Sequence, residues 1–126
     1  MGRWVDEEMT KTTHKDLDVW KLSIQLVKDI YQLTSKFPSE EKFGLTAQIR
    51  RSAVSVPSNI SEGAARNSNK DYVRFLYIAL GSLSEIETQL IIAKELSFSN
   101  NIDQLMDQVV LIRPKLLNLI KYLKSK

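Results

Sequence analysis

Apolar residues recur at helical spacing in four stretches of the sequence, and polar residues fill the positions between them. At 100° per residue each stretch has one broad apolar side, which is typical of an amphipathic helix that packs against others. Residues 1–15 show no sustained periodicity, so we expect a flexible N-terminal tail followed by one domain over residues 16–126. The pattern predicts four helices over residues 16–36, 40–66, 70–96 and 102–123.

Short polar segments separate the four stretches and supply helix-capping residues. Ser39 is expected to cap the second helix and Asn69 the third, because short polar side chains accept hydrogen bonds from the first free N–H groups. Pro57 lies in an apolar stripe that continues at the same phase, which favours a bend over a break, and Pro114 predicts a second bend. The fold class indicated is all-α, an up-down-up-down antiparallel four-helix bundle.

The second predicted helix carries a polar stripe beside its apolar one. Most of these polar side chains are short, so another helix backbone can approach closely. Asn59 and Glu62 are expected to hydrogen-bond across that contact. The stripe consists of Gln48, Ser52, Ser55, Asn59 and Glu62.

The third predicted helix is apolar over more than one side. Phe75 flanks its main apolar face, and Ile78, Ile92 and Leu96 point well away from that face. Leftover apolar residues on the far side of a helix more often belong to an interface than to bare surface. We therefore expect Phe75, Ile78, Ile92 and Leu96 to contribute to contacts between subunits.

Composition indicates an ordinary soluble protein. The chain has 126 residues, of which 43% are hydrophobic and 26% charged, as expected for one globular domain with a sizeable core. With no Cys it has neither a disulfide framework nor a thiolate metal site. No apolar run approaches the roughly 20 residues that span a bilayer, and the N-terminus lacks the apolar region of a signal peptide. We expect a cytoplasmic protein without a membrane partner.

Basic residues gather in two places, although the net charge is only +3. Residues 108–126 contain five bases and no acid. A basic end favours nucleic acid or an acidic partner, and it also complements the negative end of a terminal helix. The second group offers a candidate phosphate-binding surface. Solvated surface charge, or ion pairs with Glu62 and Asp71, is at least an equally good explanation for it. That group is Arg50, Arg51, Arg66, Lys70 and Arg74.

Two charged residues fall inside apolar arcs and predict a structural ion pair. Glu87 lies within the apolar side of the third helix and Arg113 within that of the fourth, and an unpaired charge there would be costly. Glu87 is therefore expected to meet Arg113 or an arginine of the second helix. No nucleophile or second carboxylate is paired with Glu87, so no catalytic residue is predicted.

The sequence indicates neither a metal site nor a cofactor. Bundles that bind two metal ions use Glu-x-x-His motifs on two helices. The one histidine of this chain, His14, lies in the predicted tail.

A family resemblance rests on the middle of the chain. Residues 43–63 read FGLTAQIRRSAVSVPSNISEG and residues 74–90 read RFLYIALGSLSEIETQL. Together with DLDVWKLS at residues 16–23 and FPSEEK at residues 37–42, they resemble the four-helix-bundle proteins encoded in 23S rRNA intervening sequences. The resemblance covers about residues 16–123 and implies a small cytoplasmic bacterial bundle that assembles as a ring-shaped homopentamer, with no established enzymatic activity. The related accessory proteins of diversity-generating retroelements have a similar fold, bind nucleic acid and partner a reverse transcriptase.

Two functions follow as hypotheses. The first is a non-enzymatic ring that binds RNA or DNA non-specifically through the basic residues named above. The resemblance implies that this ring is a homopentamer. The alternative is a protein-interaction adaptor, such as an accessory subunit of a reverse transcriptase, in which the basic residues have no direct nucleic-acid role.

Overall fold

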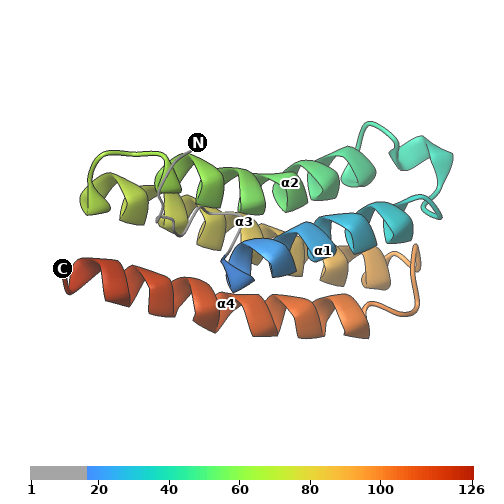
Figure 1. Ribbon diagram of the computed structural model, residues 1–126. Coiled ribbons are helices and arrows are strands. Elements are labelled where there is room, and N and C mark those ends of the chain that lie inside the picture. Colours follow the sequence, from blue (N-terminus) through green and yellow to red (C-terminus); the bar gives the residue numbers. More distant parts are fainter. Residues whose placement is uncertain (1–16) are drawn as a thin grey trace.

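Four antiparallel helices form the part of the chain that the computed structural model describes, residues 17–126; the predicted tail over residues 1–15 lies outside them. The helices lie side by side, and α1 and α3 each contact both α2 and α4 (Figure 1). No strand occurs within residues 17–126. The predicted all-α, up-down-up-down bundle is confirmed. Its elements are α1 (Asp18–Thr34), the short 3-10 helix η2 (Ser39–Glu41), α2 (Leu45–Ala64), α3 (Asn69–Glu95) and α4 (Asp103–Lys124).

The second helix begins later than its sequence predicts. Ser39 starts the separate turn η2 and makes no side-chain cap, so its predicted role is wrong. Gly44 interrupts the helix because its backbone, at φ −102° and ψ −116°, lies outside the helical region. The side chain of Glu41 reaches across this break, and its Oε1 accepts a hydrogen bond from the Leu45 N–H at 3.1 Å. A carboxylate from the preceding turn thus caps α2.

The other predicted helix boundaries are displaced by at most two residues, where the structure describes them. Ser68, rather than Asn69, caps α3, and its Oγ accepts a hydrogen bond from the Asp71 N–H at 3.1 Å. Pro57 and Pro114 both lie inside uninterrupted helices, as the continuous apolar stripe indicated for Pro57.

The core follows the predicted stripes. At helical spacing the apolar face of the fourth helix consists of Ile102, Leu105, Val109, Ile112, Leu116, Ile120 and Leu123, and all of them are buried. The same spacing places Tyr31 on the apolar side of the first helix, but 42% of this residue is exposed. The largest side chains with almost no exposure come from all four helices: Leu26, Ile30, Ile49, Ile60, Leu76, Leu83, Ile86, Leu90, Ile112 and Leu116.

Small residues bring α2 and α3 into close contact. The Ser82 hydroxyl donates to Ser55 Oγ at 2.7 Å between the two helices. Near the end of α2, a Cβ atom added to Gly63 would lie 2.8 Å from Tyr72 Cδ1 and 3.0 Å from Phe75 Cβ, so only glycine fits. The predicted close packing is present, and burial against it raises the pKa of the Tyr72 phenol.

The hydrogen bonds predicted across this contact do not form, however. Asn59 donates to the main-chain and side-chain oxygens of Ser55 in its own helix, at 2.8 and 2.9 Å. Glu62 is exposed and pairs with Arg66 one turn later. Both side chains bond to residues four positions away in sequence, Asn59 within α2 and Glu62 just past its end, where the spacing of a helical turn places neighbours close together.

One end of the bundle is closed by aromatic packing; we call it the aromatic end. Phe37 follows α1 and Phe98 follows α3, and their ring centroids are 5.7 Å apart. The chain reaches Phe98 through Ser97, whose φ of 61° is left-handed. The N–H groups of Phe98 and Ser97 donate to the carbonyls of Ala93 and Lys94 at 2.8 and 3.0 Å, which is the Schellman motif.

The opposite end is formed by three helices, because α1 is the shortest of the four and begins part-way along the bundle (Figure 1). Its first turn is held by an ion pair between Asp18 and Lys115 at 2.8 Å and by the Trp20 indole N–H, which donates to Ser61 Oγ at 3.1 Å. Beyond this level α2, α3 and α4 continue without it. At this end α2 and α4 finish and α3 begins, so the surface there is formed by these three helices.

The helix α3 is long and apolar enough, by length and composition, to cross a membrane. This corrects the expectation that no segment approaches that length. Its residues Leu76, Leu83, Ile86 and Leu90 are fully buried inside the bundle, and 33% of its most apolar 18-residue window is buried.

Candidate nucleic-acid interface

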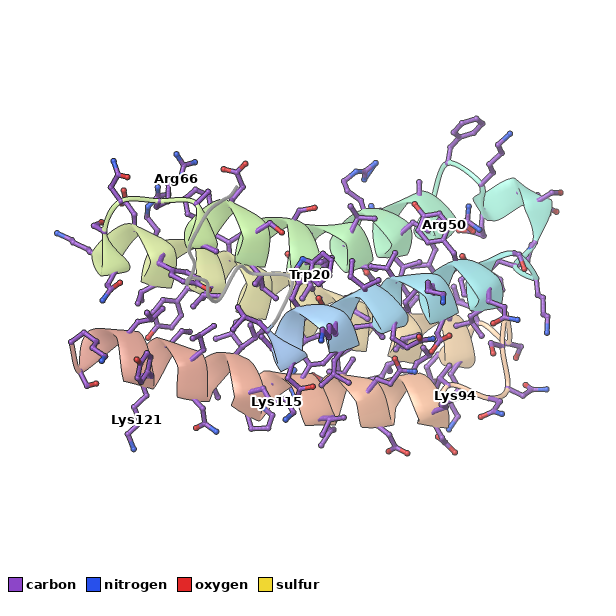
Figure 2. All side chains as sticks on the ribbon, viewed as in Figure 1. Trp20, Arg50, Arg66, Lys94, Lys115 and Lys121 are labelled. Carbon is purple, nitrogen blue, oxygen red and sulfur yellow. The ribbon has the colours of Figure 1, made fainter. Side chains whose placement is uncertain are left out.

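Six basic residues meet at the three-helix end, which we call the basic end. Residues 62–74, covering the turn from α2 to α3, and residues 121–126 at the end of α4 together contain six bases and two acids. Figure 2 shows Arg66 and Lys121 at this end of the bundle. At the aromatic end, residues 35–44 and 94–107 contain three bases and five acids. Positive charge is therefore concentrated at one end. The bases are Arg66, Lys70, Arg74, Lys121, Lys124 and Lys126.

The structure separates the predicted basic cluster into two parts. Arg50 and Arg51 lie on α2 some 15 residues before Arg66, which is about 23 Å along a helix. Arg50 and Arg66 appear near opposite ends of α2 in Figure 2. Only Arg66, Lys70 and Arg74 come together, around the turn that joins α2 to α3.

Arg50 on α2 forms hydrogen bonds to two residues of α1. Its Nε donates to Thr34 Oγ1 at 2.8 Å and its Nη2 to the Tyr31 carbonyl at 3.3 Å. The guanidinium carbon also lies 4.4 Å from the centroid of the Tyr31 ring. These contacts explain an arginine at this position without any ligand.

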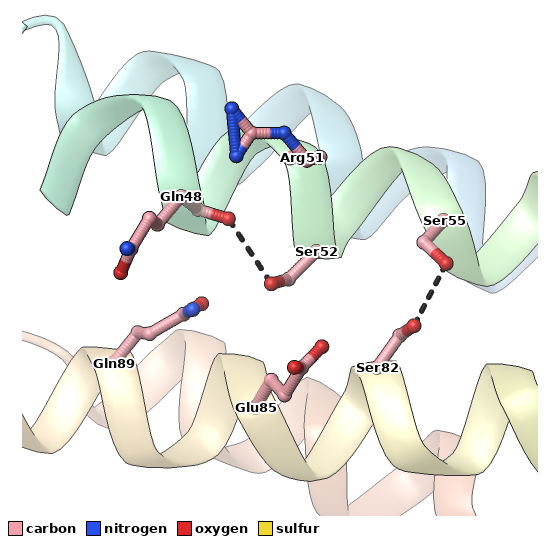
Figure 3. Close-up of a pocket in the computed structure, with 7 residues that line it drawn as sticks. All are labelled: Gln48, Arg51, Ser52, Ser55, Ser82, Glu85 and Gln89. Carbon is pink, nitrogen blue, oxygen red and sulfur yellow. Dashed lines mark hydrogen bonds between the residues drawn. The ribbon is translucent and has the colours of Figure 1, made fainter. Parts of the chain in front are cut away.

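Arg51 borders a polar groove of about 370 Å³ between α2 and α3 (Figure 3). Glu85 and Gln89 lie on its α3 side, and the side-chain amide oxygen Oε1 of Gln89 is buried without a hydrogen-bond partner. Within residues 17–126 no carboxylate forms an ion pair with Arg51. Every residue of the lining is polar: Gln48, Arg51, Ser52, Ser55, Ser82, Glu85 and Gln89.

At the basic end two arginines enclose an aromatic ring. The guanidinium carbons of Arg66 and Arg74 lie 4.7 and 4.6 Å from the centroid of Phe75. Arg66 also pairs with Glu62 at 2.8 Å, and Arg74 lies 3.8 Å from Asp71. These ion pairs are exposed and weak, so they hold the guanidinium groups in place without removing them from solvent.

Two lysines at the C-terminal end of the chain, Lys124 and Lys126, lie beside tyrosine rings. The sequence analysis did not predict these lysine–tyrosine pairs. Lys124 Nζ lies 5.8 Å from the centroid of Tyr77 on α3, and Lys126 Nζ lies 4.7 Å from that of Tyr122. Both rings are about half exposed, at 49% and 56%. The available signal was Tyr77 itself, an exposed aromatic seven residues after Lys70 and hence on the same side of α3.

A pocket of about 310 Å³ lies between the start of α3 and the end of α4. Val73 and Leu123 contribute its apolar part and are only 9% and 8% exposed. Three lysines of the basic end line the same pocket. The lining is Asn69, Lys70, Val73, Leu123, Lys124 and Lys126.

Glu87 and Arg113 form the predicted ion pair between α3 and α4. Arg113 Nη2 donates to Glu87 Oε1 at 2.6 Å, and about a third of each side chain is exposed. Asn59 and Glu62, also predicted as structural polar residues, bond to Ser55 and Arg66 as described above. Among residues 17–126 no three carboxylate or imidazole side chains gather as metal ligands do. His14 lies outside the described residues.

The predicted subunit-contact residues divide by exposure. Ile78, Ile92 and Leu96 are 43%, 41% and 56% exposed, whereas Phe75 is half-buried between its two arginines. A second apolar surface that the sequence analysis did not single out lies on α4. Its exposed residues are Val110, Leu111 and Leu117.

Comparison with known families identifies the fold and its relatives. A profile described as 23S rRNA-intervening sequence protein matches residues 15–118. The chain belongs to this family. The match covers all of α1, α2 and α3 and most of α4, and it confirms the resemblance drawn from the central motif.

A solved relative has the same fold. The crystal structure of a protein of unknown function from the S23 ribosomal protein family of Bacteroides thetaiotaomicron aligns with a TM-score of 0.58 and 24% identity. The alignment covers 85% of this chain and 95% of that one. The two proteins therefore share the helical-bundle fold. Comparison with curated proteins finds no significant match.

Proposed function

We propose that this 23S rRNA-intervening sequence protein is a non-enzymatic bundle that binds RNA or DNA through its basic end. The concentration of six bases against two acids at that end carries the proposal. Phosphate contacts from Lys and Arg supply most of the affinity in non-specific binding, and they need no particular base sequence.

The arrangement of these bases supports phosphate binding better than their number alone. Lys70, Lys121 and Lys124 form no ion pair within the described residues, so their charge is available to a ligand. Arg113 and Lys115, which lie earlier on α4, form ion pairs with Glu87 and Asp18, respectively. The surface thus lies at the end of α4 rather than along it.

Salt-dependent binding tests this function. The affinity of the full chain for a labelled oligonucleotide, followed by fluorescence anisotropy, should fall steeply between about 50 and 200 mM salt. Arg51→Gln is the control, because it removes an exposed basic residue without an ion pair from α2, away from the basic end. Absence of binding in the lowest salt, or equal losses from Arg51→Gln and Lys70→Gln, would contradict the proposal.

We also propose that the bundle assembles as a ring, with a homopentamer as the form that the resemblance implies. Two separate exposed apolar surfaces support this: Ile78, Ile92 and Leu96 on α3, and Val110 and Leu117 on α4. A contact between two different surfaces of identical chains is heterologous, and it closes into a ring if the rotation permits. The solution mass from light scattering tests it directly, and a monomer would reject it.

The same apolar surfaces favour a second candidate function, a protein-interaction adaptor such as an accessory subunit of a reverse transcriptase. In that case the basic residues change the rate at which the protein partner associates, and they do not bind nucleic acid. Recovery of one protein partner from nuclease-treated lysate, together with loss of that partner in Ile92→Glu, would favour the adaptor.

A further inference from the structure

The pocket at the basic end combines two kinds of surface that a phosphate-binding site does not need together. Lys70, Lys124 and Lys126 line it together with Val73 and Leu123, and we call the surface of these two apolar side chains its apolar floor. Phosphates alone would be bound as well by lysines on a polar surface. The apolar floor indicates a ligand with an apolar part close to its negative charges.

Tyr77 extends this apolar surface along α3. It follows Val73 by four residues, so the two side chains are neighbours on the helix. Its ring is half exposed, and Lys124, which also lines the pocket, lies 5.8 Å from the ring centroid. Tyr77 does not itself line the pocket, but its ring lies beside Lys124, which does, so an exposed ring and the basic pocket adjoin each other at the contact of α3 and α4.

The chemistry of nucleic acids distinguishes between the forms that could occupy this surface. In a duplex the bases are stacked on one another, and the protein meets phosphates and groove edges. In a single strand the flat face of a base is free to stack on an aromatic ring while the adjacent phosphates reach basic side chains. An apolar floor and an exposed tyrosine among lysines match the second case.

We infer that the pocket between α3 and α4 is a site for single-stranded nucleic acid, in which a base stacks against Tyr77 and the flanking phosphates contact Lys70, Lys124 and Lys126. This inference rests on the proposed function and specifies its ligand. It assigns separate roles to the two kinds of residue: the lysines supply salt-dependent affinity, and Tyr77 and the apolar floor supply the preference for unpaired bases.

The test compares single strands and a duplex of the same sequence, each of about 16 nucleotides. Fluorescence anisotropy with the full chain should give tighter binding of single-stranded RNA or DNA than of duplex. Tyr77→Ala should weaken single-strand binding between about fivefold and a hundredfold and leave duplex binding unchanged. Tyr77→Phe should retain wild-type affinity, because the stacking surface remains.

The chain offers a matched control at its other end. Phe43 is 89% exposed and has Lys42 Nζ 5.5 Å from its ring centroid, so it repeats the lysine–aromatic pair outside the proposed site. Phe43→Ala should leave binding unchanged. Lys70→Gln should lower the salt slope for single strands by about 0.7 without altering the preference for them, since it removes one phosphate contact. Thermal unfolding followed by circular dichroism confirms that each variant is folded.

Three results would overturn the inference. Duplex bound as tightly as single strands, or a Tyr77→Ala loss no larger than that of Phe43→Ala, rejects the stacking site while leaving nucleic-acid binding in place. No binding of any oligonucleotide in low salt rejects the inference together with the proposed function.

Discussion

The aromatic end and the basic end of the bundle are stabilised in different ways. At the aromatic end Phe37 and Phe98 pack together, and the Schellman motif around Ser97 satisfies the last carbonyls of α3. At the basic end α1 is absent, the bases outnumber the acids three to one, and exposed tyrosines lie beside lysines. The first arrangement favours stability and the second leaves charge and ring faces open to a ligand. Substitutions at the two ends should therefore affect different measurements.

The largest loss of stability is expected at the aromatic end. Phe37→Ala removes a ring that is only 8% exposed, and the cavity should cost about 3 kcal/mol. Phe43→Ala removes the same side chain from a site that is 89% exposed, so it should change stability by less than about 0.5 kcal/mol. Chemical denaturation measures both. Equal effects would show that the aromatic pair does not close this end.

Gly63→Ala tests the one tight contact near the basic end. The added methyl group would lie 2.8 Å from Tyr72 Cδ1 and 3.1 Å from the Tyr72 carbonyl oxygen. Overpacking should exceed the gain in helix propensity, for a net loss of about 2 kcal/mol. Gly81→Ala is the matched control: it adds a methyl group with no atom within 4 Å and should gain about 0.5–1 kcal/mol. A gain in both variants would mean that α2 and α3 can separate freely.

Charge removal should affect binding and leave stability unchanged. Lys124→Gln at the basic end should reduce the salt slope of nucleic-acid binding by about 0.7. Lys36→Gln near the aromatic end should leave that slope unaltered, although both residues are exposed lysines. Anisotropy titrations over a range of salt concentrations give the slopes. Identical slopes for the two variants would remove the functional distinction between the ends.

The smallest effect is expected at Ser97. Its left-handed backbone favours glycine, so Ser97→Gly should stabilise the bundle by about 0.5 kcal/mol. Ser35 ends α1 with an ordinary φ of −62°, and Ser35→Gly should give no gain. Thermal unfolding of the pair measures the difference. An equal gain in stability from both variants would mean that the left-handed conformation of Ser97 is not the cause of the gain.

The sequence predicted the helices and the core well because burial repeats at helical spacing within each helix. It failed at Gly44, where a local non-helical backbone conformation delays the start of α2 to Leu45. It also failed at Asn59 and Glu62, since helix periodicity gives the side of a residue but not which of two reachable partners it bonds.

The candidate site was only partly predictable for a related reason. Arg66, Lys70 and Arg74 are close in sequence, so their proximity follows from one turn. Tyr77 and Lys124 are 47 residues apart, and they meet only because α3 and α4 pack in a particular register. Amphipathic patterns show which faces pack together but do not determine how far one helix slides along another, so the pocket could not be found before the structure.

The hydrogen bond from Trp20 to Ser61 has a practical consequence. Ser61 lies two residues before Gly63, and Trp20 is the one tryptophan within residues 17–126, so its indole lies where α1 meets the last turn of α2. With Trp4 replaced by Phe, the emission of this indole reports from a single known position. The bundle thus carries an intrinsic fluorophore a few residues from the surface on which a ligand is proposed to bind.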